Sequence, residues 1–321
     1  TNGELGLGIG VTSVGSPQQI TAITNCVDFS LLYQHVIVLR SNGSIWSWGK
    51  NYSGELGINT TTNSFVPTQI GTDTNWASIS TGVEHSMALK TNGTLWAWGR
   101  NIYGNYGDGT TTQSNVPVQI GTQTNWTKVI AAFTYTIGFN TSTGLNVWGY
   151  NLSGNVFGTG NSTSSNIPLA VGSCTVTPPS APCWQDISAS KNSYNIGIKD
   201  NGTLWAWGSN DLGQLGDGTT TARSIPVQIG TATDWAKIST GYYNSVAIKT
   251  NGTLWTWGHN IFGQLGDSTV RTIHRDGDVV QPEIDFRFRF RCHSTPSFRD
   301  SRFDSLHDRL AVRLAVVLRV D

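Results

Sequence analysis

One short segment recurs along the chain at a nearly fixed interval, and this repeat constrains the fold more than any other feature. Its clearest copy runs from Asp200 to Gly208 and reads DNGTLWAWG. The related segments end in Trp-Gly pairs, whose tryptophans are Trp48, Trp98, Trp148, Trp207 and Trp257. Three of the four intervals between them are 50 residues long and one is 59. A fixed period in this range is typical of solenoids, propellers and other repeat arrays.

The recurring segment predicts a tight turn followed by a strand. Asn201-Gly202 favours a two-residue hairpin, and the alternation after it places Trp205 and Trp207 on one face of an extended strand. In this copy, three further strand-like pieces precede the last strand, at 226–229, 234–239 and 245–249. Four short strands per repeat are typical of a propeller blade rather than a solenoid coil. The sequence therefore predicts an all-β fold, a β-propeller with four-stranded blades.

Two further residue types repeat in step with the Trp-Gly pairs. A second set of tryptophans begins the second strand of each unit, at Trp76, Trp126, Trp184 and Trp235, with Cys26 in this place in the first unit. We expect both sets of indoles to pack between neighbouring blades, and stacking on sugars is the alternative. Prolines recur at Pro17, Pro67, Pro117, Pro168 and Pro226. Because proline donates no ladder hydrogen bond, we expect it at a sheet edge or a strand start.

A glycine-rich loop follows most of the Trp-Gly strands, with the pattern Gly-x-Leu-Gly in Gly54–Gly57 and Gly213–Gly216. We expect its leucine to fill the gap between neighbouring blades, because the glycines allow a tight backbone path. Asp108, Asp217 and Asp267 follow these loops. One carboxylate per loop offers too few oxygen ligands for Ca²⁺, so we expect no metal site.

Taken together, these motifs resemble the repeats of the regulator of chromosome condensation family. The matching segments are Gly82–Leu89, Gly202–Asn210 and Gly213–Gly216, and the resemblance covers roughly residues 1–268. It implies a β-propeller, usually of seven blades. We expect a bacterial or environmental member that is incomplete at both ends. The family's recurrent histidine is present at His35 and His85, but later units replace it with Tyr135, Tyr194 and Asn244.

The repeat also predicts the domain organisation. Units that end at the Trp-Gly pairs cover about 1–49, 50–99, 100–149, 150–208 and 209–258, with a partial unit at 259–268. The pattern then stops, and residues 269–321 contain ten arginines but neither Trp nor Asn. We interpret this tail as a frame-shifted or disordered segment. The alternative is a folded tail, with a strand around Phe286–Phe290 and a helix over Leu306–Val317, whose arginines contact acidic partners.

The longest unit contains a proline-rich insertion with a cysteine at each end, Cys174 and Cys183. A disulfide that closes this loop would favour a secreted or cell-surface location, and two free thiols are the alternative. Cys26 and Cys292 do not have the spacing of metal ligands.

No catalytic motif is present. The neighbours Glu84 and His85 would point to opposite faces of a strand, which makes them a poor acid-base pair. Net charge is zero and charged residues are 12% of the chain, so nucleic acid is an improbable partner. No apolar run is long enough to span a membrane. We therefore expect no enzyme activity and no cofactor, and an enzyme such as a lyase has no supporting acid, base or metal set.

These observations favour a scaffold that binds a protein partner of unknown identity through loops at one end of the propeller. The residues predicted for this face are Tyr103, Tyr150, Leu152, Asp211, Leu212, Ile261 and Phe262. The family resemblance implies an alternative, guanine-nucleotide exchange on a small nuclear GTPase together with docking on chromatin. The abundant tryptophans suggest another, a carbohydrate-binding surface protein.

Overall fold

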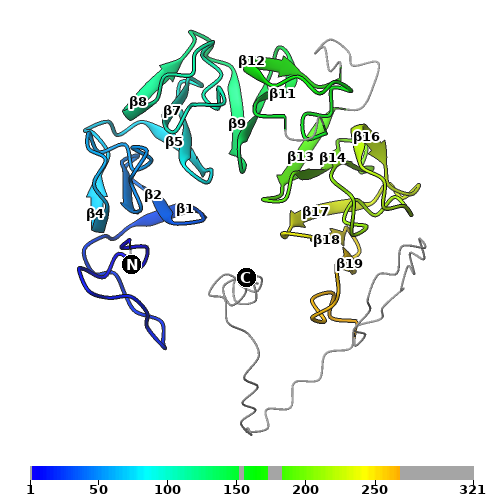
Figure 1. The fold of residues 1–321 in the computed structure, drawn as a ribbon, viewed down its shortest axis with the longest axis horizontal. Helices are drawn as coiled ribbons and strands as arrows, with labels where there is room; N and C mark the ends of the chain where they lie inside the picture. The colour runs from blue at the N-terminus through cyan, green and yellow to red at the C-terminus, as the bar shows by residue number, and fades with distance from the viewer. Residues whose placement is uncertain (1, 152–154, 173–182, 268–321) are drawn as a thin grey trace, which may run out of the picture.

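The computed structural model describes residues 2–151, 155–172 and 183–267, which form five antiparallel sheets in an arc around a central axis (Figure 1). Four of these sheets have four strands and one has three. The described residues include no helix, and so none long and apolar enough to cross a membrane. The predicted all-β propeller architecture is confirmed.

The strands follow one another in chain order within each sheet. The first sheet contains β1 (Cys26–Leu32), β2 (His35–Arg40), β3 (Ile45–Gly49) and β4 (Ser64–Gln69). The second contains β5 (Trp76–Thr81), β6 (His85–Lys90), β7 (Leu95–Gly99) and β8 (Ser114–Ile120). The third contains β9 (Trp126–Ala131), β10 (Tyr135–Asn140), β11 (Gly144–Gly149) and β12 (Ser165–Ala170). The fourth contains β13 (Trp184–Ala189), β14 (Tyr194–Lys199), β15 (Leu204–Gly208) and β16 (Arg223–Gln228). The last contains β17 (Trp235–Thr240), β18 (Asn244–Lys249) and β19 (Leu254–Gly258).

The sheets are offset by one strand from the repeat as it is divided at the Trp-Gly pairs. β16, which carries Pro226, pairs with β15, which ends in Trp207-Gly208, and not with β17. The reason is that the glycine-rich loop joins two adjacent antiparallel strands, so the proline strand returns alongside the strand before it. Its place at the sheet edge confirms the expectation for Pro67, Pro117, Pro168 and Pro226, whereas Pro17 lies on no strand.

The predicted turn at Asn201-Gly202 is present, but it has three residues and not two. Gly202 N donates to Lys199 O at 2.8 Å and Lys199 N donates to Thr203 O at 3.0 Å, so residues 200–202 form the turn, and only Gly202 among them has a positive φ. Gly202 has φ of +75°, and a Cβ there would lie 2.0 Å from the Thr233 carbonyl oxygen, so only glycine fits. Asn201 Oδ1 accepts hydrogen bonds from the amide and the hydroxyl of Thr203, at 3.2 and 2.7 Å. The strand that follows holds Trp205 and Trp207 on one face, with ring centroids 6.3 and 5.2 Å from that of Trp184.

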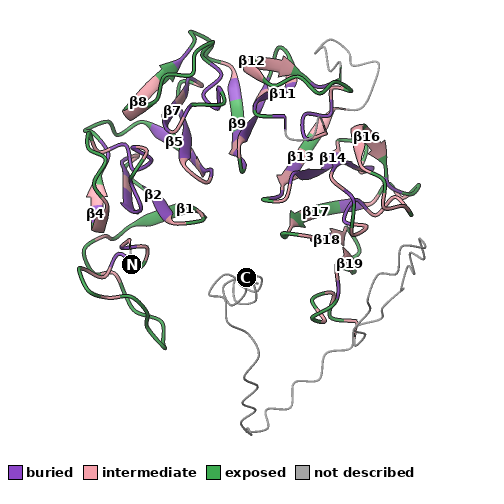
Figure 2. Cartoon of the chain, in the orientation of Figure 1, coloured by how far each residue is buried: buried purple, intermediate pink, exposed green. Residues whose placement is uncertain are grey.

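The core lies in the seams between neighbouring sheets, and Figure 2 shows the buried residues mainly on the middle strands of the sheets, such as β2, β7, β11 and β14. In the first seam, Ile37 and Ile45 of the first sheet pack against Trp76 and Trp98 of the second. Trp98, Trp148 and Trp207 are fully buried in these seams, whereas Trp184 and Trp257 are half-buried. Leu56 and Leu215 of the glycine-rich loops are also fully buried, as predicted.

Candidate partner-binding face

Two kinds of connection meet on one face of the arc, at one end of its central axis, and we call this face the loop end. Short turns join the first and second strands of each sheet, and the glycine-rich loops follow the third strands. Backbone hydrogen bonds hold the turns and the loops together: Arg100 N donates to Glu84 O at 2.7 Å, and Tyr150 N donates to Thr134 O at 2.9 Å. The loop end is therefore an extension of the sheets with a defined backbone.

Each glycine-rich loop is also latched to the next sheet. The Glu55 carbonyl accepts hydrogen bonds from Trp98 Nε1 and from Ser86 Oγ, both at 2.9 Å. His35 Nε2 lies 3.0 Å from the same Ser86 hydroxyl. The later loop carbonyls accept the same pair of hydrogen bonds: Asn105 from Trp148 and Thr136, Val156 from Trp207 and Asn195, and Gln214 from Trp257 and Ser245. This pair of hydrogen bonds, which we call the latch, therefore ties each loop to the sheet that follows it.

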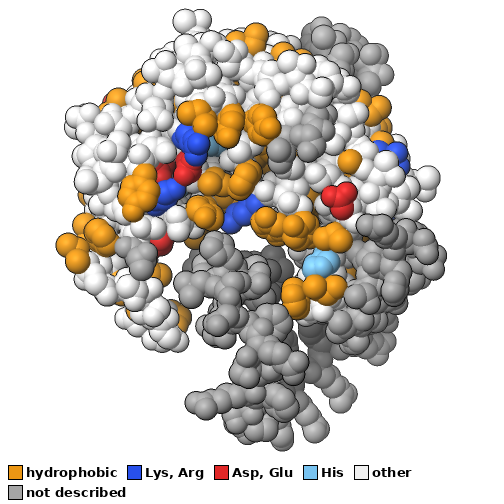
Figure 3. All heavy atoms as spheres, in the orientation of Figure 1, with side chains coloured by type: hydrophobic (Ala, Val, Ile, Leu, Met, Phe, Trp, Pro, Cys, Tyr) orange, Lys and Arg blue, Asp and Glu red, His pale blue; other side chains and the backbone are white. Residues whose placement is uncertain are grey.

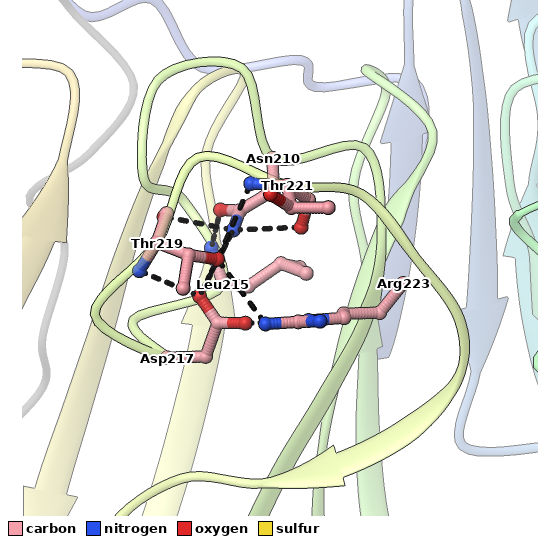
Figure 4. A network of polar contacts seen from close by, with 6 residues as sticks. All are labelled: Asn210, Leu215, Asp217, Thr219, Thr221 and Arg223. Atoms are coloured by element: carbon pink, nitrogen blue, oxygen red, sulfur yellow. Dashed lines mark hydrogen bonds and ion pairs between the residues drawn. The ribbon is translucent and has the colours of Figure 1, made fainter. Parts of the chain in front are cut away.

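An asparagine two residues after each Trp-Gly strand holds the loop in its internal shape, as Figure 4 shows for Asn210. Its Nδ2 donates to the carbonyls of Thr219 and Thr221 at 2.9 and 3.1 Å, and its Oδ1 accepts from Leu215 N at 3.0 Å. The equivalent residues are Asn51, Asn101, Asn151 and Asn260, and all of them are buried. Sequence reasoning gave these asparagines no role, although their fixed spacing from the Trp-Gly pairs was visible.

The aspartates after the glycine-rich loops serve the same local structure. Asp217 Oδ1 accepts from Thr219 N and Oγ1 at 3.0 and 2.8 Å, while Asp217 Oδ2 pairs with Arg223 Nε at 2.6 Å (Figure 4). Asp108 likewise binds Thr110. Among the described residues, no group of His, Cys, Asp or Glu could hold a metal ion.

The loop end brings two of the predicted site residues together. Tyr103, after β7, and Tyr150, after β11, stack with ring centroids 4.9 Å apart and an interplanar angle of 26°. The guanidinium of Arg100 lies 5.9 Å from the centre of the Tyr103 ring. The two tyrosines remain 38% and 37% exposed. They form a preordered aromatic surface across the seam between the second and third sheets.

The other predicted residues lie in later loops. Asp211 and Leu212 follow β15, and Ile261 and Phe262 follow β19, where Phe262 packs edge-on against His259 at 6.2 Å. These two sets are separate from the tyrosine pair. Leu152 lies outside the described residues, and so does Cys174, so that its predicted bridge to Cys183 stays a prediction.

Sequence reasoning missed a second ring of residues, in the turns between the first and second strands. It consists of Tyr33, Val83, Phe133, Lys191 and Tyr242, one from each sheet, and all but the half-buried Val83 are exposed. Tyr52 and Ile102 in the loops are exposed as well. Figure 3 shows hydrophobic side chains gathered around the central hollow on this face, with Lys and Arg side chains among them. Tyr33, Val83, Phe133 and Tyr242 each stand two residues before the start of a second strand, whereas Lys191 stands three before Tyr194 because its turn is one residue longer.

A charged clamp joins the first two sheets at the loop end. Lys50 Nζ lies 2.6 Å from Glu84 Oε1, and Arg100 pairs with the other oxygen of the same carboxylate. Burial opposes ionisation of Glu84, but the hydrogen bonds from Lys50 and Arg100 outweigh it and hold the pKa of this carboxyl below its ordinary value.

Glu84 and His85 do not form an acid-base pair. Glu84 binds the two cations, whereas His85 Nε2 lies 3.2 Å from Thr136 Oγ1 in the seam. Burial lowers the pKa of His85 to about 4. Burial and the nearby charges of His85 and Lys50 lower the pKa of His35 to about 3. Both imidazoles are therefore neutral structural groups at neutral pH.

A pocket of about 170 Å³ lies on the face opposite the loop end, between the third and fourth sheets. Its lining includes Thr127, Phe139, Asn140, Thr141, Gly144, Leu145, Cys183 and Trp184. Among the described residues that line it, Cys183 is the one ionisable side chain, so these residues offer no pair of groups for acid-base chemistry.

The RCC1-like domain family model matches residues 1–302. The chain belongs to the RCC1-like domain family. The five sheets, latched through their tryptophans, are thus RCC1-like propeller blades, and the resemblance drawn from the sequence is confirmed.

This RCC1-like domain is similar to several known proteins. It is 36% identical over 67 residues to the mouse protein described as probable E3 ubiquitin-protein ligase HERC4, which is 20% of this chain and 6% of that protein. Human WBSCR16 superposes with a TM-score of 0.61 at 21% identity, covering 70% of this chain and 58% of WBSCR16. Prp20p from Saccharomyces cerevisiae superposes with a TM-score of 0.59 at 15% identity, covering 76% and 74% of the two chains. At these identities the structural likeness shows the fold.

Proposed function

We propose that this chain is a non-enzymatic protein-binding scaffold that contacts its partner through the loop end. The observation that carries the proposal is the stacked pair of Tyr103 and Tyr150, held across a seam and still more than one third exposed. Tyrosine and arginine are enriched in the central parts of protein interfaces, and Arg100 lies beside this pair.

The latches explain why the loop end suits this role. Binding costs less free energy when the contacting side chains are already ordered, because less conformational entropy is lost. Here the backbone carbonyl of each loop is bound by a buried indole of the next sheet, as at Glu55 and Trp98. The exposed side chains of neighbouring loops are therefore presented at fixed separations, while their identities differ from sheet to sheet.

Two other functions have less support in the described residues. The yeast protein Prp20p has binding properties toward Gsp1p and histones, which is a precedent for protein partners of this fold. Nothing on the loop end of this chain points specifically to nucleotide exchange. Sugar stacking would need exposed indoles, whereas the Trp98, Trp148 and Trp207 rings are buried.

The test compares partner capture by matched variants. We expect Tyr103→Ser combined with Tyr150→Ser to reduce capture of a specific partner at least tenfold, measured by quantitative mass spectrometry of affinity-purified complexes. The control is Val66→Ser combined with Ile225→Ser, because these residues on the outer strands β4 and β16 are 48% and 56% exposed. Equal loss in both double variants, or no loss in the tyrosine variant, would contradict the proposal.

A further inference from the structure

We infer that the partner presents a basic segment to the loop end of the last sheet, with a Lys or Arg side chain that lies over the rings of Tyr242, Tyr243, His259 and Phe262. We call these four rings the aromatic cluster. The inference rests on the proposed function, because it names the chemistry of the partner that the loop end would bind. It assigns the aromatic cluster to the recognition of a cation.

The rings of the aromatic cluster contact one another edge-on in a chain. Ring centroids are 4.6 Å apart for Tyr242 and Tyr243, 5.8 Å for Tyr243 and His259, and 6.2 Å for His259 and Phe262, with interplanar angles of 70°, 64° and 83°. Tyr242 and Phe262 remain 51% and 67% exposed. A cation binds over the face of an aromatic ring, and these two exposed rings offer such faces to a partner.

Hydrogen bonds hold the aromatic cluster in place before any partner binds. The Gln264 side chain joins two of its members, because Oε1 accepts from Phe262 N at 2.8 Å and Nε2 lies 3.0 Å from His259 Nδ1. The turn before β18 is fixed from the fourth sheet by Ser190 Oγ, which donates to the Gly241 carbonyl at 2.7 Å. A cation would therefore meet rings whose ordering costs little further entropy.

In the first two sheets, a cation of the chain itself lies over the exposed aromatic ring of the glycine-rich loop. The Arg100 guanidinium lies 5.9 Å from the centre of the Tyr103 ring and pairs with the Glu84 carboxylate. In the first sheet, Lys50 Nζ lies 5.6 Å from the centre of the Tyr52 ring. Each of these loops therefore supplies both the ring and the cation.

The last sheet has the same backbone register with an aromatic residue in place of each charge. His259 and Tyr243 take the places of Arg100 and Glu84, because His259 N donates to Tyr243 O at 3.0 Å. Burial lowers the pKa of His259, so this ring is uncharged at neutral pH. Among the residues that the structure describes, no Lys or Arg lies over any ring of the aromatic cluster. A Lys or Arg of the partner would thus take the place that Arg100 has in the second sheet.

The charge around the aromatic cluster also favours a cation. The charged residues in the turns and glycine-rich loops at the loop end of the last two sheets are Lys191, Asp211, Asp217 and Asp267. Asp217 pairs with Arg223, and the other two aspartates outnumber the one lysine. Burial, Tyr242 and the Asp211 carboxylate together raise the pKa of Tyr243, so this carboxylate acts directly on the cluster. It would attract a cation to the rings and repel an anion.

The test uses a random peptide library displayed on phage and selected against the full chain, and the selected peptides are then synthesised as probes. Their dependence on the aromatic cluster is measured with Tyr242→Ser combined with Phe262→Ser. We expect the peptides that lose binding to this double variant to contain Lys or Arg. Replacing that Lys by norleucine, or that Arg by citrulline, should weaken binding at least tenfold, which is about 1.4 kcal/mol.

Two further variants change the charge at the aromatic cluster. His259→Arg should weaken binding of the same peptides at least tenfold, because it places a cation of the chain where Arg100 stands in the second sheet. Asp211→Asn should weaken binding about threefold at low salt, since its carboxylate is exposed and screened.

Val66→Ser combined with Ile225→Ser is the matched control and should leave binding within twofold, because both residues lie on outer strands. Thermal melts of this control and of the Tyr242 and Phe262 double variant should match that of the parent chain, since all four side chains are exposed.

The outcomes separate this inference from the proposed function. Peptides that depend on the aromatic cluster but lack Lys and Arg, or that still bind after the neutral replacement, would overturn the basic partner and keep the loop-end scaffold. Unchanged binding to His259→Arg would do the same, and so would a selection in which every peptide depends on Tyr103 and Tyr150 and none on the cluster. Peptides whose binding survives both double variants of the loop end, or a selection that yields no binding peptide, would overturn both proposals.

Discussion

At the scale of the residue, one backbone carbonyl in each seam accepts two hydrogen bonds from the next sheet. The Glu55 carbonyl accepts from the indole of Trp98 and from the hydroxyl of Ser86, and both donors are buried. Leaving a buried donor without a partner costs about 1–3 kcal/mol, so such a bond is expensive to lose even when its net contribution is small. In the side chain of Glu55, Oε2 accepts a hydrogen bond from Ser53 N at 2.7 Å, whereas the buried Oε1 has no partner.

Glu55→Gln should stabilise the chain at neutral pH by about 1–2 kcal/mol. Glu55 is fully buried, its Oε1 has no hydrogen-bond partner, and burial raises its pKa. A carboxyl with a raised pKa in the folded state loses its favourable contribution as pH rises through that pKa, so the parent chain is penalised at neutral pH. An amide has room here, because Gln214 is fully buried at the equivalent position of the fourth sheet. Its Nε2 has no hydrogen-bond partner either, so the expected gain comes from removing a buried charge and not from a new hydrogen bond.

The measurement is the free energy of unfolding by denaturant as a function of pH. Glu84→Gln is the control and should destabilise the chain, because Glu84 pairs with Lys50 and Arg100. A Glu55→Gln variant less stable than the parent at neutral pH would refute this account of the buried carboxylate.

The two buried histidines predict a loss of stability in mild acid. Their pKa values are about 3 for His35 and about 4 for His85 in the folded chain, against about 6.5 in an unfolded one. The unfolded state therefore binds protons first as pH falls below about 6.5, and the fold loses on the order of 3 kcal/mol per histidine by about pH 4. NMR should show no titration of either imidazole between about pH 8 and 5, and a normal titration there would contradict the burial of these rings.

At the scale of the element, the second glycine of each glycine-rich loop packs directly against a tryptophan ring of the next sheet. A Cβ on Gly107 would lie 2.8 Å from Trp148 Nε1, and Gly107 has φ of +81°. The same relation joins Gly57 to Trp98 and Gly216 to Trp257. The loop therefore needs glycine for its backbone conformation and for the space that the indole occupies.

Gly107→Ala should destabilise the chain by about 3 kcal/mol or more, because it adds a steric conflict to an unfavourable φ. Gly121→Ala is the control, since Gly121 has φ of +62° but nothing within 4 Å of an added Cβ; it should cost about 1–2 kcal/mol. Chemical unfolding of both variants gives the difference, and equal losses would show that the indole does not need this space.

The sequence predicted these elements well because each strand and turn depends on local residue types. Asn201-Gly202 determines its hairpin, and Trp205 and Trp207 share a face by simple alternation. The pairing of β16 with β15 was missed, since strand alternation does not say which neighbour an edge strand joins. The set of turn residues Tyr33, Val83, Phe133 and Tyr242 was missed for a similar reason: only the arrangement of the sheets in the arc brings one turn from each sheet to the same face.

At the scale of the whole molecule, each sheet packs on its neighbours in the arc, as in other repeat proteins (Figure 1). The two end sheets have a face that no other described sheet covers. Phe29 on β1 and Leu254 on β19 are exposed, whereas their equivalents Ile79 and Leu95 are buried in seams. Stability should therefore be lowest at the ends of the arc.

Hydrogen exchange measured by mass spectrometry should show this gradient. We expect the amides of β1 and of β18 and β19 to exchange faster than those of β6, β7 and β10, because local opening of an end sheet breaks one seam instead of two. Uniform protection across all five sheets would indicate that the ends are covered in solution and would contradict this prediction.

The latch between sheets has a consequence for how such chains diversify. The acceptor of the latch is a main-chain oxygen, so the hydrogen bond does not depend on the side chain of the residue that supplies it. These residues are Glu4, Glu55, Asn105, Val156 and Gln214. A sheet bearing a different set of loop-end residues can thus be inserted, duplicated or exchanged without redesigning the joints on either side. Recombination between repeats would then shuffle the contact residues of this face while the architecture beneath it is inherited intact.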